Sequence, residues 1–305
     1  MGIFMTGGTG FVGSMLARDL AERGHEITIL TRPGEKKPAG FKEGTVNFLE
    51  GDPSGKGSWQ VEASHCEVFI NLAGASIFSR WNSETKRAIR ESRILTTRHL
   101  VEAIAMREGK ETTLLSTSAV GYYGFHDDEV LNERDTAGSD FLATVAADWE
   151  KEALEASKFG ARVVICRFGI VLGKGGGAIS QMIPLFKYWM GSPLGSGRQW
   201  FSWIHERDLW NIYSFLLEHK EISGPVNCSS PNPVRNREMT QALAKALGKP
   251  LFLPAVPSFV LRFMLGEFGD ILLKGQRVYP GRLMEEGFDF IFSDIGEALK
   301  DIVTD

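Results

Sequence analysis

The stretch from Ile3 to Leu30, IFMTGGTGFVGSMLARDLAERGHEITIL, constrains the fold of this chain more than any other. A short apolar run at 3–5 precedes four glycines, at positions 7, 8, 10 and 13, and an apolar pattern of helical period follows them. Gly24 ends that pattern, and residues 26–30 have the composition of a second strand. This order of strand, glycine turn, helix and strand within about thirty residues is typical of a dinucleotide-binding unit.

The spacing of the glycines gives each of them a physical role. Gly7 permits a tight turn, Gly10 lets the backbone approach a pyrophosphate, and Gly13 lets the helix pack closely on the sheet. Phe11 and Val12 open the helix, whose free N–H groups and partial positive charge would face the anion. We therefore predict that these five residues bind the cofactor; the alternative is a glycine-rich turn without a ligand.

The end of the second strand indicates which dinucleotide is bound. An NAD site normally offers a carboxylate there to the ribose 2′-hydroxyl, whereas this chain has Thr31 and Arg32, followed by Lys36 and Lys37. A guanidinium can pair with a 2′-phosphate through two hydrogen bonds. The sequence predicts NADP(H) as the cofactor, with Thr31 and Arg32 in its site; an exposed loop arginine is the alternative.

Strands and helices alternate through the first half of the chain. Further strands are predicted at 46–49, 68–72, 113–115 and 162–166, with helices at 83–107 and 141–158. Such alternation predicts an α/β fold with a doubly wound parallel sheet, whose ligands collect at the carboxyl ends of its strands. Further cofactor residues are expected at those ends. They are Asp52, Leu72, Ala73, Gly74 and Leu172.

The pattern changes after about residue 174. Aromatic residues and glycines dominate the next thirty positions, and a late sheet strand is predicted near 224–230. We predict a cofactor-binding domain at 1–174, completed by that late strand, and a smaller, interwoven substrate lobe at 175–305. Candidates for lining a substrate pocket, with core packing as the alternative for each, are Trp189, Trp200, Phe201 and Trp203.

Composition limits the classes of binding partner that the protein can have. A formal net charge of −4 and the lack of a Lys/Arg block argue against nucleic acid. No apolar stretch approaches membrane-spanning length, so no membrane partner is expected. The three cysteines lie far apart and favour free thiols in a reducing compartment. We expect a soluble protein in the cytoplasm, with another reducing lumen as the alternative. The six histidines show no metal-ligand spacing, so no metal site is predicted.

The chain resembles the extended short-chain dehydrogenase/reductase family over nearly its whole length. The motifs that carry the resemblance are TGGTGFVG at 6–13, NLAG at 71–74, STS at 116–118 with Tyr123-Gly124, RFGIVLG at 167–173 and WIHERD at 203–208. It is similar in particular to the subgroup called epimerase family protein, related to nucleoside-diphosphate-sugar epimerases, through RWNSET at 80–85, GSGRQWFSWIH at 195–205 and GQRVYP at 275–280. The resemblance implies a Rossmann domain, NADP binding and a C-terminal substrate lobe.

The resemblance also indicates where catalysis would occur and where this chain departs from the pattern. The family uses a serine or threonine at a strand end, matched by Ser118, and a Tyr-x-x-x-Lys pair one helix later. Here the tyrosine position falls on Leu142 and the lysine position on Ala146. The segment STSAVGYYG at 116–124 instead offers Tyr122 and Tyr123 as proton carriers. The alternative is that both tyrosines only pack and hydrogen-bond.

A second departure concerns the helix that precedes the serine strand. Aligning Thr97 and Leu100 with the family pattern places Arg93 where an asparagine is usual. An arginine pointing into the crevice would reach a cofactor phosphate or ribose in place of the missing lysine. The alternative is a surface arginine paired with Glu84 or Glu91.

Two functions remain open from the sequence. The first is an NADP-dependent oxidoreductase or epimerase that acts on a small polar molecule, with nucleotide sugars among the candidates. The second is a catalytically silent NADP-binding sensor or regulator, which the missing Tyr-x-x-x-Lys pair favours. Helices of this fold often pair, so a homodimer is open beside a monomer.

Overall fold

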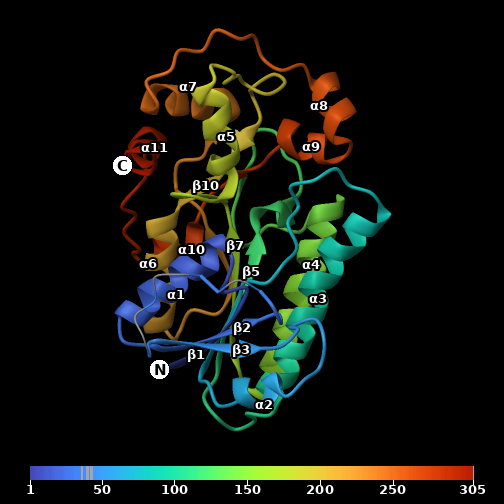
Figure 1. Cartoon of the computed structure of the whole chain (residues 1–305), viewed down its shortest axis with the longest axis vertical. Helices are drawn as coiled ribbons and strands as arrows, with labels where there is room; N and C mark the ends of the chain where they lie inside the picture. The colour runs from blue at the N-terminus through green and yellow to red at the C-terminus, as the bar shows by residue number, and fades with distance from the viewer. Residues whose placement is uncertain (36, 39–40, 42–43, 305) are drawn as a thin grey trace.

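A seven-stranded parallel sheet forms the centre of the molecule, in a computed structural model that describes residues 1–35, 37–38, 41 and 44–304 (Figure 1). Its strand order is β11-β7-β5-β4-β1-β2-β3, and every neighbouring pair is parallel. The strands are β1 (Gly2–Thr6), β2 (Glu26–Thr31), β3 (Val46–Glu50), β4 (Val68–Asn71), β5 (Thr113–Ala119), β7 (Arg162–Phe168) and β11 (Gly224–Cys228). The predicted doubly wound α/β fold is confirmed.

Helices cover both faces of this sheet. On one face lie α1 (Phe11–Glu22) and α6 (Glu206–Glu218), which contact each other. The other face carries α2 (Trp59–Ala63), α3 (Ser83–Ala105), α4 (Phe141–Leu154) and the short η2 (Glu155–Phe159). A parallel sheet covered on both sides explains why its strands read as nearly continuous apolar runs.

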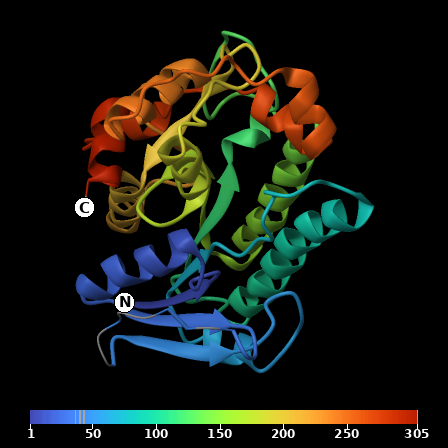
Figure 2. The same ribbon diagram turned by 45° about the horizontal axis from the view of Figure 1, so that its top comes forward.

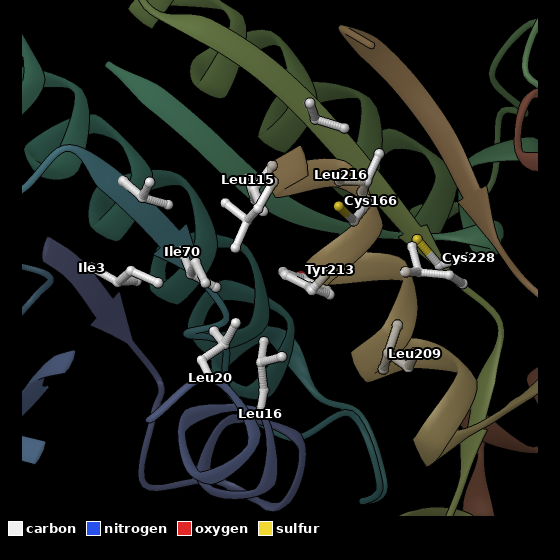
Figure 3. Packing of buried hydrophobic residues seen from close by; sticks show 14 of the residues in the cluster. Ile3, Leu16, Leu20, Ile70, Leu115, Cys166, Leu209, Tyr213, Leu216 and Cys228 are labelled. Atoms are coloured by element: carbon white, nitrogen blue, oxygen red, sulfur yellow. The ribbon is translucent and has the colours of Figure 1, made fainter. Parts of the chain in front are cut away.

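The sheet packs against its helices through two apolar cores, one on each face. Figure 3 shows the first core, in which Leu16 and Leu20 of α1 and Tyr213 of α6 point toward Ile70 and Leu115 of the sheet. The second core lies on the opposite face, where Phe4, Phe69 and Leu114 meet α2 and α3. Each fully buried aliphatic or aromatic side chain of this size contributes about 1.5–3 kcal/mol to folding.

The C-terminal part of the chain builds a lobe at one end of the molecule, as Figures 1 and 2 show for α7, α8 and α9. It has its own apolar core, in which Trp203 and Leu172 lie with Met239 and Leu299. Its helices and strands are β8 (Ile170–Leu172), α5 (Gly177–Lys187), β9 (Trp200–Phe201), β10 (Trp203–His205), β12 (Val234–Arg235), α7 (Asn236–Ala246), α8 (Ser258–Leu265), α9 (Phe268–Leu273), β13 (Arg277–Val278), α10 (Gly281–Glu285) and α11 (Ile295–Val303).

The lobe and the sheet are interwoven along the chain. After β7 the chain enters the lobe through β8 and α5, returns to the sheet through α6 and β11, and then enters the lobe again with β12 and α7. The remaining short elements, η1 (Val120–Tyr123) and β6 (Val130–Leu131), follow β5, and β6 pairs with β13 of the lobe. The domain boundary at residue 174 stays a prediction. None of the described helices is both long and apolar enough to cross a membrane.

His205 lies at the junction between the sheet-facing helix α6 and the lobe. Its imidazole is fully buried, its Nδ1 accepts a hydrogen bond from the backbone N–H of Arg207, and its ring centroid lies 3.9 Å from that of Phe292. Nε2 lies 3.3 Å from an Asp301 carboxylate oxygen in α11, without the geometry of a hydrogen bond. Burial lowers the pKa of His205 to about 4, although Asp301 opposes this shift.

This depressed pKa makes folding sensitive to acid. A histidine in an unfolded chain has a pKa of about 6.5, whereas the pKa of His205 in the folded chain is about 4, so stability is lost as the pH falls through this window. We expect wild-type protein to lose about 2 kcal/mol between pH 7 and pH 5 from this group alone. Urea unfolding of wild type and His205→Gln, which keeps an acceptor but does not titrate, measures the difference; equal pH dependence of the two proteins would contradict it.

Candidate functional site

A cavity of about 510 Å³ opens at the carboxyl edge of the sheet, between the sheet and the C-terminal lobe. Its wall includes the glycine turn, the ends of β4, β5 and β7, one side of α4 and part of the lobe. Trp200, predicted as a substrate-pocket residue, lines it, as do nine of the residues predicted for cofactor binding or catalysis. They are Gly7, Gly10, Phe11, Val12, Gly13, Leu72, Gly74, Arg93 and Ser118.

The glycine turn is packed too closely for any side chain. Gly7 has a φ of +70°, and a Cβ atom on it would lie 2.6 Å from the carbonyl carbon of Leu72. A Cβ on Gly13 would lie 2.2 Å from the carbonyl oxygen of Gly7. No side chain caps the start of α1 in the described structure, so its first N–H groups are free for an anion in the cavity. The turn therefore has the form that a pyrophosphate requires.

A second glycine-rich segment, at 173–177, encloses the ring of Phe11. A Cβ on Gly176 would lie 2.1 Å from this ring, and one on Gly177 would lie 3.2 Å from it. Gly177 also lines the cavity. The loop into the lobe thus packs directly on the first residue of α1, which fixes the lobe against the glycine turn.

Arg93 lies on the cavity wall without a carboxylate partner. Its guanidinium donates to the backbone carbonyls of Ala75 at 3.1 Å and Ile89 at 2.9 Å, and it lies 5.3 Å from the ring centroid of Trp149. Within the described residues it forms no ion pair, so the pairing with Glu84 or Glu91 considered above does not occur. Burial lowers the pKa of Arg93 to about 10. An anion in the cavity would offset this desolvation.

Ser118, near the end of β5, belongs to a buried network of hydrogen bonds. Its hydroxyl donates to Glu150 of α4 at 2.6 Å, and Arg167 of β7 donates to both oxygens of this carboxylate at 2.8 Å. Arg167 also donates to the hydroxyl of Tyr123 at 2.9 Å, and that hydroxyl donates to Asn227 of β11 at 2.7 Å. Burial opposes the charge of Arg167, yet these contacts with Glu150 and Tyr123 raise its pKa.

Neither of the two tyrosines lines the cavity among the described residues. Tyr123 is fully buried, and burial raises its pKa to about 12 despite the nearby Arg167. Its hydroxyl is occupied on both sides, so the geometry gives Tyr123 a packing role instead of a place on the cavity wall. Tyr122 lies beneath the Arg167 guanidinium, whose central carbon is 3.6 Å from its ring centroid. Both aromatic rings thus serve to enclose the buried ion pair.

The side of α4 that faces the cavity is apolar. Leu142 and Ala146, one helical turn apart, line it together with Val145 and Trp149. These two residues occupy the positions that the family resemblance assigns to tyrosine and lysine. Among the described residues, α4 therefore presents neither a phenol nor an ammonium group to the cavity.

The residues predicted around the 2′-phosphate lie outside the cavity wall. Thr31 is buried, whereas the Arg32 side chain is 62% exposed and its Nε lies 3.8 Å from Asp52. Glu35, which the sequence analysis did not consider, accepts from the Thr9 hydroxyl at 2.6 Å and from the Arg32 backbone N–H at 3.1 Å. The carboxylate of Glu35 thus ties the glycine turn to the end of β2. Lys36 lies outside the described residues.

Two other predicted residues also lie away from the cavity wall. Leu172 is buried in β8 and belongs to the core of the lobe. The Ala73 backbone N packs against the turn, where a Cβ on Gly7 would lie 2.7 Å from it. Both shape the site from behind, as far as the described part of the chain shows.

A second cavity, of about 690 Å³, adjoins the first and shares Trp200, Lys274 and Gly275 with it. Cationic side chains are prominent in its wall: Arg198, Arg235 and Lys274, opposed by Asp127 and Asp128. The Arg235 guanidinium pairs with Asp128 and lies 3.8 Å from the ring centroid of Trp200. Lys274 and Arg198 form no ion pair within the described residues, so this cavity suits an anionic group.

Comparison with known proteins decides the family. A family model described as "NAD dependent epimerase/dehydratase family" matches residues 3–229. The chain belongs to the NAD-dependent epimerase/dehydratase family. A second model, for a domain of unknown function (DUF1731), matches residues 256–302. The central sheet is accordingly the NAD(P)-binding Rossmann fold of this family, and the resemblance noted in the sequence is confirmed.

Members of the epimerase family from distant organisms are similar over the whole length. "Epimerase family protein SDR39U1 homolog, chloroplastic" of Arabidopsis thaliana is 41% identical, over 99% of this chain and 87% of its own. "Epimerase family protein YfhF" of Bacillus subtilis is 39% identical, over 100% of this chain and 99% of its own. A crystal structure of human epimerase family protein SDR39U1 (isoform 2) with NADPH superimposes with a TM-score of 0.85 at 31% identity, covering 99% of both chains.

The sequence analysis missed several residues that the fold brings to the site. Glu150 accepts directly from Ser118, and Asn227 accepts directly from Tyr123. Lys274 and Gln276 reach the cavity from the lobe. A signal for the lobe residues was present, since GQRVYP at 275–280 already stood out as a subgroup motif. Glu150 gave a weaker signal, as a lone carboxylate on the apolar side of a helix.

The buried ion pair leads to a prediction about stability. Replacing Glu150 by Ala leaves the Arg167 charge buried without a carboxylate, which we expect to cost about 3–5 kcal/mol of unfolding free energy. Glu152→Ala, two residues along the same helix, removes the partner of the half-exposed Arg98 and should cost less than about 1 kcal/mol. Denaturant unfolding of both variants measures the two costs. Equal costs would show that the buried pair is not specially important.

Proposed function

We propose that this protein binds NADP(H) and acts as an oxidoreductase or epimerase on a small polar substrate, with nucleotide sugars as one candidate class. One observation carries the proposal: a single cavity joins the glycine turn, an arginine without a carboxylate partner and a serine hydroxyl. Bound NADP(H) would supply or accept the hydride. The free thiols are consistent with a reducing compartment such as the cytoplasm.

The chain's own residues suit this cofactor. The backbone of Gly7, Gly10 and Gly13, with the uncapped start of α1, would hold the pyrophosphate. Arg93 would pair with a phosphate or a ribose hydroxyl at the cavity wall. The exposed Arg32 would pair with the 2′-phosphate, and NADPH in the human relative's structure supports that choice. We retain Thr31, Asp52, Leu72, Ala73, Gly74 and Leu172 as residues that shape this site.

On the substrate side, Ser118 would orient the reacting group. Because its hydroxyl donates to Glu150, the oxygen is left to accept a hydrogen bond from a substrate hydroxyl. A phosphate or carboxylate elsewhere on the substrate would lie in the second cavity, near Arg198 and Lys274. Of the two phenols we retain Tyr122 as a proton carrier. It is the residue next to Gly121, which lines the cavity, and its hydroxyl forms no hydrogen bond among those described.

The alternative function is a catalytically silent NADP(H) sensor. The apolar pair Leu142 and Ala146 on the cavity wall favours it, because neither side chain can move a proton or hold a ribose hydroxyl. Both functions need the same cofactor site, so cofactor affinity does not distinguish them. Turnover does.

Arg32 offers the test of cofactor choice. A charged hydrogen bond to the 2′-phosphate is worth about 1.5–3 kcal/mol, so Arg32→Asp should weaken NADPH binding about ten- to a hundredfold while NADH binding is kept. Arg134→Asp, at an exposed position in another part of the chain, is the matched charge control. Calorimetric titration of both cofactors measures the ratio. An unchanged preference for NADPH in Arg32→Asp would contradict the assignment.

Ser118 offers the test of catalysis. With NADPH bound, we expect its oxidation when a pool of carbonyl metabolites, including keto-sugar nucleotides, is added. Ser118→Ala should lower kcat/KM by about a hundredfold with little change in NADPH affinity, and Tyr122→Phe tests the phenol in the same assay. Ser64→Ala, whose hydroxyl donates to a backbone carbonyl of α2, is the control. NADPH binding with no turnover across the pool would instead support the sensor.

A further inference from the structure

Large apolar side chains are exposed in two short segments of the C-terminal lobe. Nearly half of the exposed large apolar residues of the described structure lie there. Phe263 is 83% exposed, Tyr188 74%, Phe259 73% and Phe252 70%. We call these residues together the distal face: Leu185, Tyr188, Trp189, Met190, Phe252, Leu253, Phe259, Phe263 and Met264.

One ring contact joins the two segments of the distal face, and the chain connects them to α8. The rings of Trp189 and Phe252 stack at 5.8 Å, which joins the end of α5 to the segment after α7. That segment crosses one end of the molecule and leads into α8 (Figure 1). Phe259 and Phe263 are four residues apart and so lie on one side of α8. Neither cavity described above is lined by any side chain of the distal face.

The sequence stretches that carry this face contain basic residues and no acidic ones. The chain contains 38 Asp and Glu residues, yet none occurs at 174–205 or at 239–266, the stretches that carry the face. Lys187, Lys245 and Lys249 lie in these stretches and form no ion pair among the described residues, and Lys249 Nζ is 4.7 Å from the Trp189 ring centroid. Arg262 pairs with Asp270 and is neutralised. A chain with a net charge of −4 thus concentrates positive charge beside its exposed aromatic rings.

We propose that the distal face binds the surface of an anionic lipid bilayer. Tryptophan and tyrosine rings favour the headgroup level of a membrane, and lysines beside them are attracted to anionic lipids. The short helix α8 would lie in the plane of the interface with Phe259 and Phe263 inserted. Because no described helix spans a bilayer, the attachment is peripheral. The sequence analysis expected no membrane partner because no stretch is long enough to span a bilayer; the proposal departs from that expectation, since binding to a bilayer surface needs no spanning stretch.

Other occupants fit the face less well. A second copy docked face to face would bring together two surfaces whose stretches 174–205 and 239–266 contain lysines and no carboxylate to pair with them. A protein partner normally meets a surface depleted in lysine and packs anchor residues into pockets. Here the aromatic side chains protrude, with Phe263, Tyr188 and Phe259 each more than 70% exposed. A fluid lipid surface accepts protruding rings without a matching pocket.

Flotation with vesicles tests the proposal on the full chain. We expect the protein to bind vesicles of phosphatidylcholine with about 30% phosphatidylglycerol, and to bind pure phosphatidylcholine at least about tenfold more weakly. Phe259→Ser with Phe263→Ser should weaken binding by about tenfold or more, because two buried rings are lost. Lys187→Gln and Lys249→Gln should each weaken it about fivefold.

A matched control uses exposed apolar residues far from the face. Val61 of α2 and Met106 after α3 are 52% and 56% exposed, and α2 lies at the opposite end of the molecule (Figure 1). Val61→Ser with Met106→Ser should float like wild type. The proposal is overturned if wild type ignores anionic vesicles, or if both double variants lose binding equally. It is also overturned if sedimentation without lipid reveals a dimer that Phe259→Ser with Phe263→Ser dissociates.

Discussion

The buried ion pair between Arg167 and Glu150 is the interaction on which the geometry of the candidate site depends. Burying two charges is costly unless their hydrogen bonds are satisfied. Here the two side chains bond to each other, Glu150 also accepts from Ser118, and Arg167 also donates to Tyr123. Through this pair β5, α4, η1, β7 and β11 are tied together at the carboxyl edge of the sheet. The same contacts set the direction of the Ser118 hydroxyl and keep the Tyr123 phenol out of the cavity.

The glycine turn and Arg93 line the same cavity as Ser118 of this network. The turn offers unpaired backbone donors at the start of α1, while Arg93 offers a full charge that has only carbonyl oxygens as partners among the described residues. A buried cation without a carboxylate is unfavourable by itself, and an anionic ligand would compensate it. The glycine turn and Arg93 line the same cavity, although they are far apart in the sequence. Both favour an anion, so the cavity suits a phosphorylated cofactor.

Much of the fold follows directly from the sequence. The strand, glycine turn and helix at 3–22 and the apolar strands at 68–72 and 162–166 have strong local patterns, and all were found where they were predicted. The sequence left two roles open for Tyr123 and could not choose between them, because Tyr123 donates to Asn227, which is 104 residues away along the chain. The second cavity could not be predicted from the sequence either. It joins residues near 126, 198, 235 and 274, and only tertiary packing brings these together.

The position of β11 has a consequence for folding during synthesis on the ribosome. This outer strand completes the sheet beside β7, but it is synthesised only after the first part of the C-terminal lobe. Until Cys228 has emerged, β7 is an unpaired edge of apolar character, and Tyr123 and Arg167 lack Asn227 nearby. The nascent chain therefore passes through a stage at which an incomplete sheet, with β7 at its edge, must be shielded from aggregation.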